Sequence, residues 1–94
     1  MDRTESERRS NDLLIREFEI EPNALVSGAH LYTDLGLDSL DSVDLIAALE
    51  REFGIAIDRQ QDEKTLRAMR TLDDVHAFIA RKLGLVAEVK DNPS

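Results

Sequence analysis

Residues 34–46 of this 94-residue chain have the sequence Asp34-Leu35-Gly36-Leu37-Asp38-Ser39-Leu40-Asp41-Ser42-Val43-Asp44-Leu45-Ile46. Gly36 is typical of a turn, and the side chain of Asp38 can cap the start of a helix. Asp41, three residues later, completes a pair that resembles a capping box near the positive end of the helix dipole. The stretch therefore predicts a helix that starts at a solvent-facing serine, Ser39, with acidic residues on both sides.

The remaining elements follow from apolar spacing and from cap or breaker residues. The helix after Ser39 is expected to run to about Phe53 and to end at Gly54. The other elements are expected to be a helix within residues 3–18, a long loop over 19–29, a short helix at 64–69 and a last helix from Thr71 to Gly84. The sum is an all-α fold, a small antiparallel four-helix bundle with three main helices and one short one. Residues 1–84 would form this domain, and residues 85–94 a flexible C-terminal tail.

The chain is strongly acidic, with 20 acidic against 12 basic side chains and a formal charge of −8. That charge repels phosphate backbones and excludes nucleic acid as a favoured partner. It complements a basic protein surface, although acidic charge also serves solubility alone, and both interpretations stay open here.

Further classes are excluded by what the sequence lacks. There is no cysteine, so disulfides, thiolate metal sites and a cysteine nucleophile are ruled out. No apolar run approaches the roughly 20 residues that span a bilayer, so membrane insertion is not expected. The first residues lack the pattern of a signal peptide, which favours a cytoplasmic protein, and we expect a monomer.

The helix over residues 39–53 has two apolar sides. At about 100° per residue, one side faces the core, and a second lies roughly 140° away. A bundle of this size cannot bury both, so the second side is predicted to be an exposed strip with charged borders, as in protein-docking sites. Scattered surface residues, or residues covered by the preceding loop, would be the structural alternative. The core side is formed by Leu45, Ile46, Leu49 and Phe53, the second side by Leu40, Val43 and Ala47, and the borders by Asp41, Asp44, Glu50 and Arg51.

Ser39 does not have the surroundings of a catalytic nucleophile. Glycines of a nucleophile elbow are missing around it, and its anionic neighbours oppose an alkoxide. His30, in the loop, and His76, expected on a helix surface, are the only possible histidine bases, and neither is expected to be one. A phosphate ester at a helix start would be favoured by free backbone N–H groups, but on the sequence pattern alone an ordinary first-turn serine is slightly favoured. An EF-hand beginning at Asp34 fails at its glycine and glutamate positions, so no metal site is predicted.

Residues 34–45 resemble the attachment site of acyl carrier proteins of freestanding fatty-acid synthesis systems. The similarity covers about residues 10–83, including 48–55 and 71–75. It implies that Ser39 carries 4′-phosphopantetheine, attached by a phosphopantetheinyl transferase (holo-carrier-protein synthase) that uses coenzyme A and magnesium, with Asp38 helping to hold that magnesium. Acyl groups would then be carried as thioesters on the thiol of the arm, and the chain itself would not be an enzyme.

The resemblance also implies partners and a cargo site. Acyl-activating, condensing and acyl-transfer enzymes with basic patches would meet the strip, through Leu40, Asp41, Val43, Asp44, Ala47, Glu50 and Arg51. The acyl pocket would be lined by Ile46, Leu49, Phe53, Leu66, Met69, Val75 and Ile79.

Two features depart from the family pattern. Arg51 stands where another acid is usual, and the segment 58–70 is about four residues longer than usual. Because this segment borders the acyl pocket in the family, we expect a specialised carrier for an unusual or long acyl chain, with Leu66 and Met69 lining an enlarged pocket. A peptidyl or D-alanyl carrier, and an unmodified acidic interaction module, are the alternatives.

Overall fold

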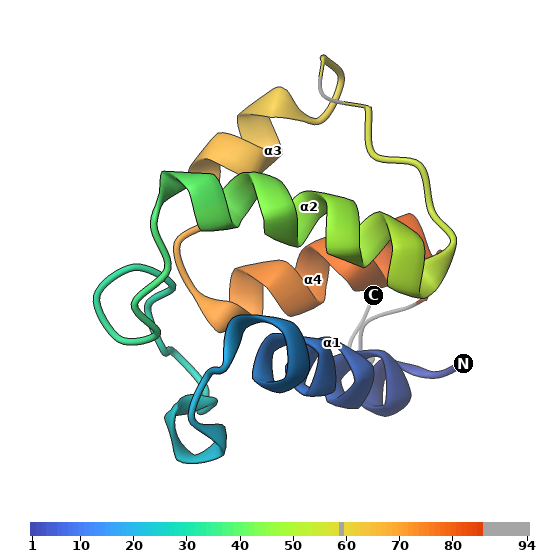
Figure 1. Ribbon diagram of the computed structural model, residues 1–94. Helices are drawn as coiled ribbons and strands as arrows, with labels where there is room; N and C mark the ends of the chain where they lie inside the picture. Colours follow the sequence, from blue (N-terminus) through green and yellow to red (C-terminus); the bar gives the residue numbers. More distant parts are fainter. Residues whose placement is uncertain (59, 86–94) are drawn as a thin grey trace.

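The computed structural model describes residues 1–58 and 60–85, and over these residues it is all-α. The helices are α1 (Arg3–Phe18), α2 (Ser39–Phe53), α3 (Glu63–Ala68) and α4 (Leu72–Lys82), with a 3-10 turn, η1, at Pro22–Ala24. α1 runs antiparallel to α2 and α4, while the short α3 lies beside the first half of α2 (Figure 1). The expected four-helix fold is confirmed. From residue 86 onward, the predicted C-terminal tail lies outside the described residues.

The helix ends follow from local side chains. Asp2 caps α1, with its Oδ1 accepting from the Glu5 backbone N–H at 2.8 Å. α2 ends at Gly54, whose φ of 64° is the left-handed conformation that glycine adopts without strain. Thr71 and Asp74 form a capping box at the start of α4, as predicted. The Arg70 backbone N–H also donates to the Asp74 carboxylate at 2.8 Å, and this bond lowers the pKa of Asp74.

α1 ends at Glu19 in a strained backbone conformation. Its φ of 54° makes it the non-glycine residue with a positive φ in the described part of the chain. The left-handed conformation costs a residue with a Cβ roughly 1 kcal/mol. The geometry still satisfies the helix end, because the Glu19 backbone N–H donates to the Leu14 carbonyl.

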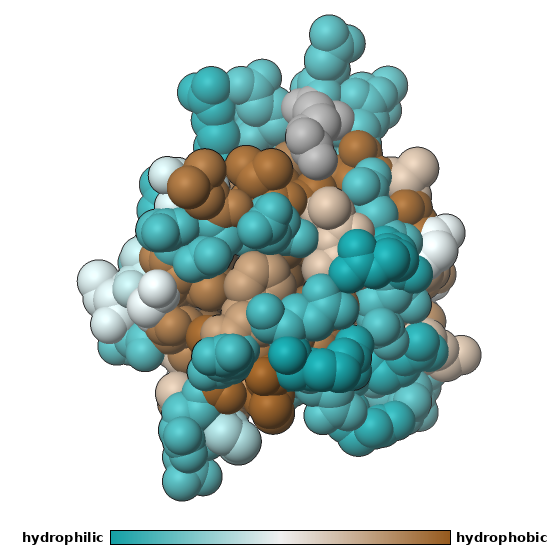
Figure 2. Space-filling model, viewed as in Figure 1, coloured by the Kyte–Doolittle hydropathy of each residue, from teal (hydrophilic) through white to brown (hydrophobic). Residues whose placement is uncertain are grey.

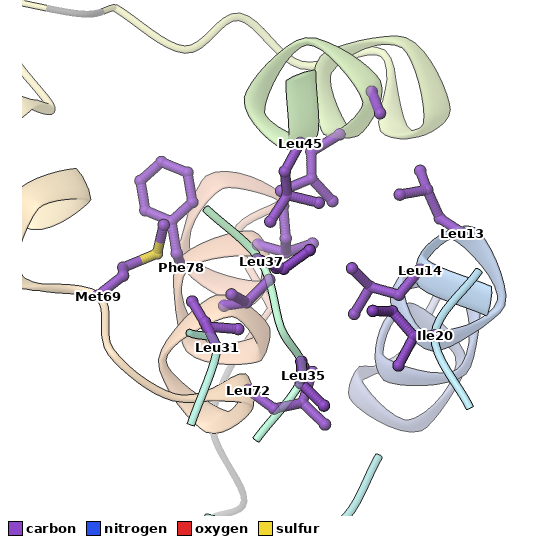
Figure 3. Close-up of a cluster of buried hydrophobic side chains, with 14 of the residues drawn as sticks. Leu13, Leu14, Ile20, Leu31, Leu35, Leu37, Leu45, Met69, Leu72 and Phe78 are labelled. Atoms are coloured by element: carbon purple, nitrogen blue, oxygen red, sulfur yellow. The ribbon is translucent and has the colours of Figure 1, made fainter. Parts of the chain in front are cut away.

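The core is aliphatic and lies where α1, α2 and α4 meet. Leucines from the loop before α2 enter it beside the leucines of the helices (Figure 3). The only fully buried aromatic side chain among the described residues is Phe78. The core side predicted for α2 is correct in its centre, because Leu45 and Leu49 are buried, whereas Ile46 and Phe53 at its edges are partly buried.

A short bridge joins the loop before α2 to the start of α4. His30 and Thr71 form an isolated antiparallel β-bridge. The Leu31 backbone N–H donates to the Arg70 carbonyl, and the Leu72 N–H donates to the Ala29 carbonyl, each at 2.8 Å. The start of α2 is therefore held in register with the start of α4.

The placement of His76 corrects the sequence interpretation. Predicted on a helix surface, it is only 7% exposed, and its Nε2 lies 2.9 Å from Asn11 Oδ1 on α1. The reason is helical geometry, since His76 lies four residues after Leu72 and three before Ile79 and shares their buried face. Burial lowers the pKa of His76.

None of the helices in residues 1–58 and 60–85 is long and apolar enough to cross a membrane.

Candidate functional site

The loop before α2 fixes the serine that opens the helix. Leu31, Leu35 and Leu37 are buried on the core side of this loop and anchor it. Asp34 tightens the turn, because one carboxylate oxygen accepts from the His30 backbone N–H at 2.7 Å. Gly36 provides the left-handed φ of 75° that the turn requires. The buried leucines thus alternate with exposed turn residues, and the chain enters α2 at a fixed position.

The predicted capping box at α2 is present with both bonds. Asp38 Oδ1 accepts from the Asp41 backbone N–H at 2.9 Å, and Asp41 Oδ2 accepts from the Asp38 N–H at 3.1 Å. Such a cap is typically worth about 1 kcal/mol. Both carboxylates are therefore engaged with the backbone on either side of Ser39.

Ser39 is the first residue of α2 and is exposed. The first N–H groups of a helix have no intrahelical acceptor, and together with the helix dipole they favour an anion. A phosphate ester on the Ser39 hydroxyl would lie beside the free ends of these N–H groups. The position therefore fits a phosphate group attached through serine.

The second side of α2 is exposed, as predicted. Leu40 is 75% exposed, Val43 is 52% exposed, and Ala47 is exposed as well. We call these three residues the apolar strip. Figure 2 shows apolar surface over the first half of α2 with hydrophilic side chains around it. A rimmed apolar surface of this kind is typical of a protein-docking site.

The acidic and basic residues at the borders of the apolar strip differ in their surroundings. Asp44 is exposed beside the apolar strip, whereas Glu50 is partly buried. Glu50 Oε2 accepts from the Ile57 backbone N–H at 2.9 Å and so holds the connector after α2. The Arg51 guanidinium lies 2.9 Å from the Glu17 carboxylate of α1. Glu50 and Arg51 are thus both engaged within the chain.

A small apolar cavity lies between α2, α3 and α4. Its volume is about 40 Å³, enough for one or two water molecules but not for a long acyl chain. Met69 and Phe78 line it and lie near each other in Figure 3. All the residues around it are Leu31, Tyr32, Ser42, Leu45, Ile46, Leu49, Leu66, Met69 and Phe78.

An open groove of about 530 Å³ adjoins this cavity on the Ser39 side. It is lined by Tyr32, Ser39, Ser42, Ile46, Gln60, Glu63, Leu66 and Arg67. Ser39 therefore lies in a groove whose inner residues also line an apolar cavity.

The structure brings together part of the acyl pocket expected from sequence. Ile46, Leu49, Leu66 and Met69 line the cavity. Phe53, Val75 and Ile79 do not line it, and the last two are fully buried in the core. Sequence reasoning missed five lining residues, which are Leu31, Tyr32, Ser42, Leu45 and Phe78. The loop residues carried no periodic signal, but Leu45 and Phe78 already stood on predicted core faces.

The long segment after α2 is anchored at its acidic residues. Asp58 Oδ1 accepts from the Gln60 backbone N–H at 2.8 Å. Asp62 Oδ2 lies 2.7 Å from Lys82 Nζ on α4, and this contact lowers the pKa of Asp62. The Arg70 guanidinium donates to the carbonyl of Arg67 at the end of α3. α3 is thereby tied to α4 while its own residues stay exposed or half-buried.

Metal-binding groups are not assembled here. Within residues 1–58 and 60–85, no three or more histidine, aspartate or glutamate side chains are arranged to hold a metal ion.

Comparison with known proteins agrees with this geometry. Residues 12–70 match the family described as "Phosphopantetheine attachment site", which covers more than half of the chain. The chain belongs to the acyl carrier protein family. It is 36% identical over 83 residues to an acyl carrier protein of Thermosynechococcus vestitus, covering 88% of this chain and 98% of the relative. It is 32% identical over 71 residues to an acyl carrier protein of Bdellovibrio bacteriovorus, covering 76% and 86%.

Membership of this family confirms the predicted carrier class. Acyl carrier proteins are non-catalytic, and their cofactor is a covalently bound 4′-phosphopantetheine. When bound, that group supplies a thiol on which acyl chains are held as thioesters. Acyl carrier proteins work with the synthase that attaches the arm and with acyl-handling enzymes.

Proposed function

We propose that Ser39 carries the 4′-phosphopantetheine arm and that the chain presents acyl thioesters to partner enzymes. The observation that supports Ser39 is that, among residues 1–58 and 60–85, its hydroxyl has no hydrogen-bond partner, unlike those of the other serines in the matched range. The matched range 12–70 contains three serines. The Ser27 hydroxyl donates to Asp73 Oδ2 at 3.1 Å, and the Ser42 hydroxyl donates to the Asp38 carbonyl at 3.3 Å. Ser39 is the exposed serine at the helix start, beside the groove.

For attachment of the arm, the chain needs to supply only the Ser39 hydroxyl, and the transferase supplies the base. The Ser39 Oγ would form a bond to the β-phosphorus of coenzyme A as the bond to adenosine 3′,5′-bisphosphate breaks, and the hydroxyl proton would leave to a base of the transferase. The capping box holds the serine at the N-terminus of α2, where the helix dipole favours the resulting phosphodiester. Asp38 is proposed to help hold the magnesium of the transferase through the part of its carboxylate that the cap leaves free.

The test is a mass measurement after incubation with a phosphopantetheinyl transferase, coenzyme A and magnesium. The chain should gain the mass of one arm, Ser39→Ala should gain none, and Ser27→Ala should gain it normally. Peptide mapping of the modified chain should place the arm on Ser39 and not on Ser42. No gain under conditions that modify a known carrier protein, or a gain in Ser39→Ala, would contradict the proposal.

We also propose that the apolar strip is the docking surface for partner enzymes. Leu40, Val43 and Ala47 would make the apolar contact, while Asp44 faces basic groups on the partner. Asp41 would do so through the carboxylate oxygen that the capping box does not use. Glu50 and Arg51 extend the surface, with a smaller share because each already has a partner within the chain.

Val43→Glu tests this surface at its centre. The exposed position should leave the fold intact, since Val43 is 52% exposed, while the buried charge should weaken docking. Ser39→Ala gives the contrasting variant, because it should dock but not carry cargo. A Val43→Glu chain that partner enzymes load and unload at the wild-type rate would rule the strip out.

The cargo is proposed to be a specialised acyl chain held between α2, α3 and α4. Support comes from Leu66 and Met69 of the long segment, both of which line the cavity. Replacing both by alanine should shift the preferred chain length towards longer chains. An unchanged preference, measured by loading acyl groups of increasing length, would count against this role.

A further inference from the structure

The groove and the cavity share a border made of four residues. Tyr32, Ser42, Ile46 and Leu66 line both spaces, whereas Ser39 lines the groove alone. Anything attached to Ser39 that enters the cavity from the groove must therefore pass these four side chains.

Two of the border residues carry hydroxyl groups. The Tyr32 Oη lies 3.4 Å from the Ser42 Oγ, longer than the usual O–H···O distance of about 2.8 Å. The contact is therefore weak, so the Tyr32 O–H stays available as a donor, while Ser42 Oγ, whose proton goes to the Asp38 carbonyl, stays available as an acceptor. We call these two groups the hydroxyl pair.

The hydroxyl pair is held in place by its surroundings. The Tyr32 backbone N–H donates to His30 Nδ1 at 3.2 Å, and the two rings lie 5.7 Å apart. Ser42 lies one turn after Ser39 on α2 and also donates to the Asp38 carbonyl. Tyr32 is still 39% exposed, so its ring forms part of the outer wall of the entrance.

The other side chains around the cavity are apolar. Leucine, isoleucine, methionine and phenylalanine side chains form the rest of its lining. An oxygen atom deep inside would lack a hydrogen-bond partner, which is costly. An oxygen at the border would find the Tyr32 O–H as a donor and, if it is a hydroxyl, Ser42 Oγ as an acceptor. Because the cavity is only about 40 Å³, it takes the terminal carbons of a short chain and leaves the atoms next to the thioester at the border.

We propose that Tyr32 and Ser42 determine cargo specificity, by holding an oxygen substituent close to the thioester of a short acyl chain. The chemical class is a 3-hydroxyacyl or 3-oxoacyl group, in preference to the saturated chain of the same length. The inference rests on the proposed function, because it requires the cargo to be carried on Ser39.

The test compares a matched pair of cargoes, butyryl and 3-hydroxybutyryl. Each is loaded on the phosphopantetheinylated chain, and the rate of thioester cleavage by hydroxylamine is followed by intact mass. Dividing each rate by that of the same thioester on free pantetheine removes intrinsic reactivity. In the wild type, the 3-hydroxy thioester should be protected more strongly, by about two- to tenfold, which is the size of one net hydrogen bond.

Tyr32→Phe removes only one hydroxyl and keeps the ring. It should bring the protection ratio of the two cargoes close to one, and Ser42→Ala should lower the ratio as well. Thr33→Val is the matched control, because Thr33 is the adjacent exposed hydroxyl residue and lines neither space. Thr33→Val should keep the wild-type ratio.

The outcomes separate the two proposals. If the wild-type chain gains no arm, the proposed function fails and the inference fails with it. If the chain is loaded but Tyr32→Phe keeps the wild-type ratio, or if the wild type protects both cargoes equally, only the inference is overturned.

Discussion

Asp38 caps α2 and has a proposed role in holding magnesium, and a pair of substitutions can separate the two. Its side chain accepts from the Asp41 backbone N–H at 2.9 Å and caps α2. Asp38→Ala removes that acceptor, which typically costs about 1 kcal/mol of the free energy of unfolding. For a domain of this size, that lowers the midpoint of thermal unfolding by roughly 4–8 °C. Asparagine caps about as well as aspartate, so Asp38→Asn should stay within a few tenths of a kcal/mol of the wild type.

The rate of modification should separate asparagine from the wild type, although their stabilities are nearly equal. Asp38→Asn retains the cap but loses the negative charge proposed to help hold the magnesium of the transferase. Its rate of phosphopantetheine transfer should fall by roughly tenfold or more, as for other groups that support a metal ion. Glu21→Gln is the control, since it removes one negative charge from an exposed position outside α2.

The assays are urea or thermal unfolding and the time course of mass gain with a phosphopantetheinyl transferase. Equal stability of Asp38→Ala and Asp38→Asn would refute the capping argument. A wild-type transfer rate in Asp38→Asn would refute the metal role and leave Asp38 as a cap alone.

Two further predictions concern stability. Burial lowers the pKa of His76 below its ordinary value near 6.5, so below that pH the unfolded chain binds more protons than the folded one, and stability should fall as pH decreases from about 7 to 5. His76→Gln, measured by urea unfolding across that range, should flatten the decrease, and an unchanged slope would exclude His76 as its cause. Glu19→Gly should stabilise the chain by about 0.5 kcal/mol, because relief of the left-handed strain exceeds the added entropy of the unfolded state. Glu19→Ala keeps the strain and should give no gain, so an equal gain in both variants would point to the lost charge instead.

The local features of the fold could be predicted from the sequence because their causes are local. The capping boxes at Asp38 and Thr71 need only residues three apart, and Gly54 needs only its own conformational freedom. The two-sided character of α2 also follows from one helical period, and Leu40 and Val43 are exposed as that geometry requires.

Features that depend on contacts between distant segments were missed. His76 lies on the buried face of α4, but its hydrogen bond comes from Asn11, 65 positions away. Tyr32 precedes the predicted turn at Gly36 and carried no periodic signal, and its place at the border of groove and cavity depends on where α2 and α3 meet. The Glu50 carboxylate is expected to face a partner, and its hydrogen bond with the Ile57 backbone N–H was not predicted. No periodicity within one segment carries this information.

The weak anchoring of α3 has a consequence for how a cargo of variable size is accommodated. α3 has six residues, none of them buried, and the Asp62–Lys82 contact of 2.7 Å ties its start to α4. Its local opening free energy should therefore be lower than that of α2 or α4, with correspondingly faster amide hydrogen exchange. A cargo too long for a cavity of about 40 Å³ can be buried only in molecules in which α3 is displaced. The apparent equilibrium constant for burying the chain is therefore the intrinsic constant multiplied by the fraction of such molecules. Chain-length preference is then governed by the opening equilibrium of one short helix, and mutations that never touch the cargo should change it.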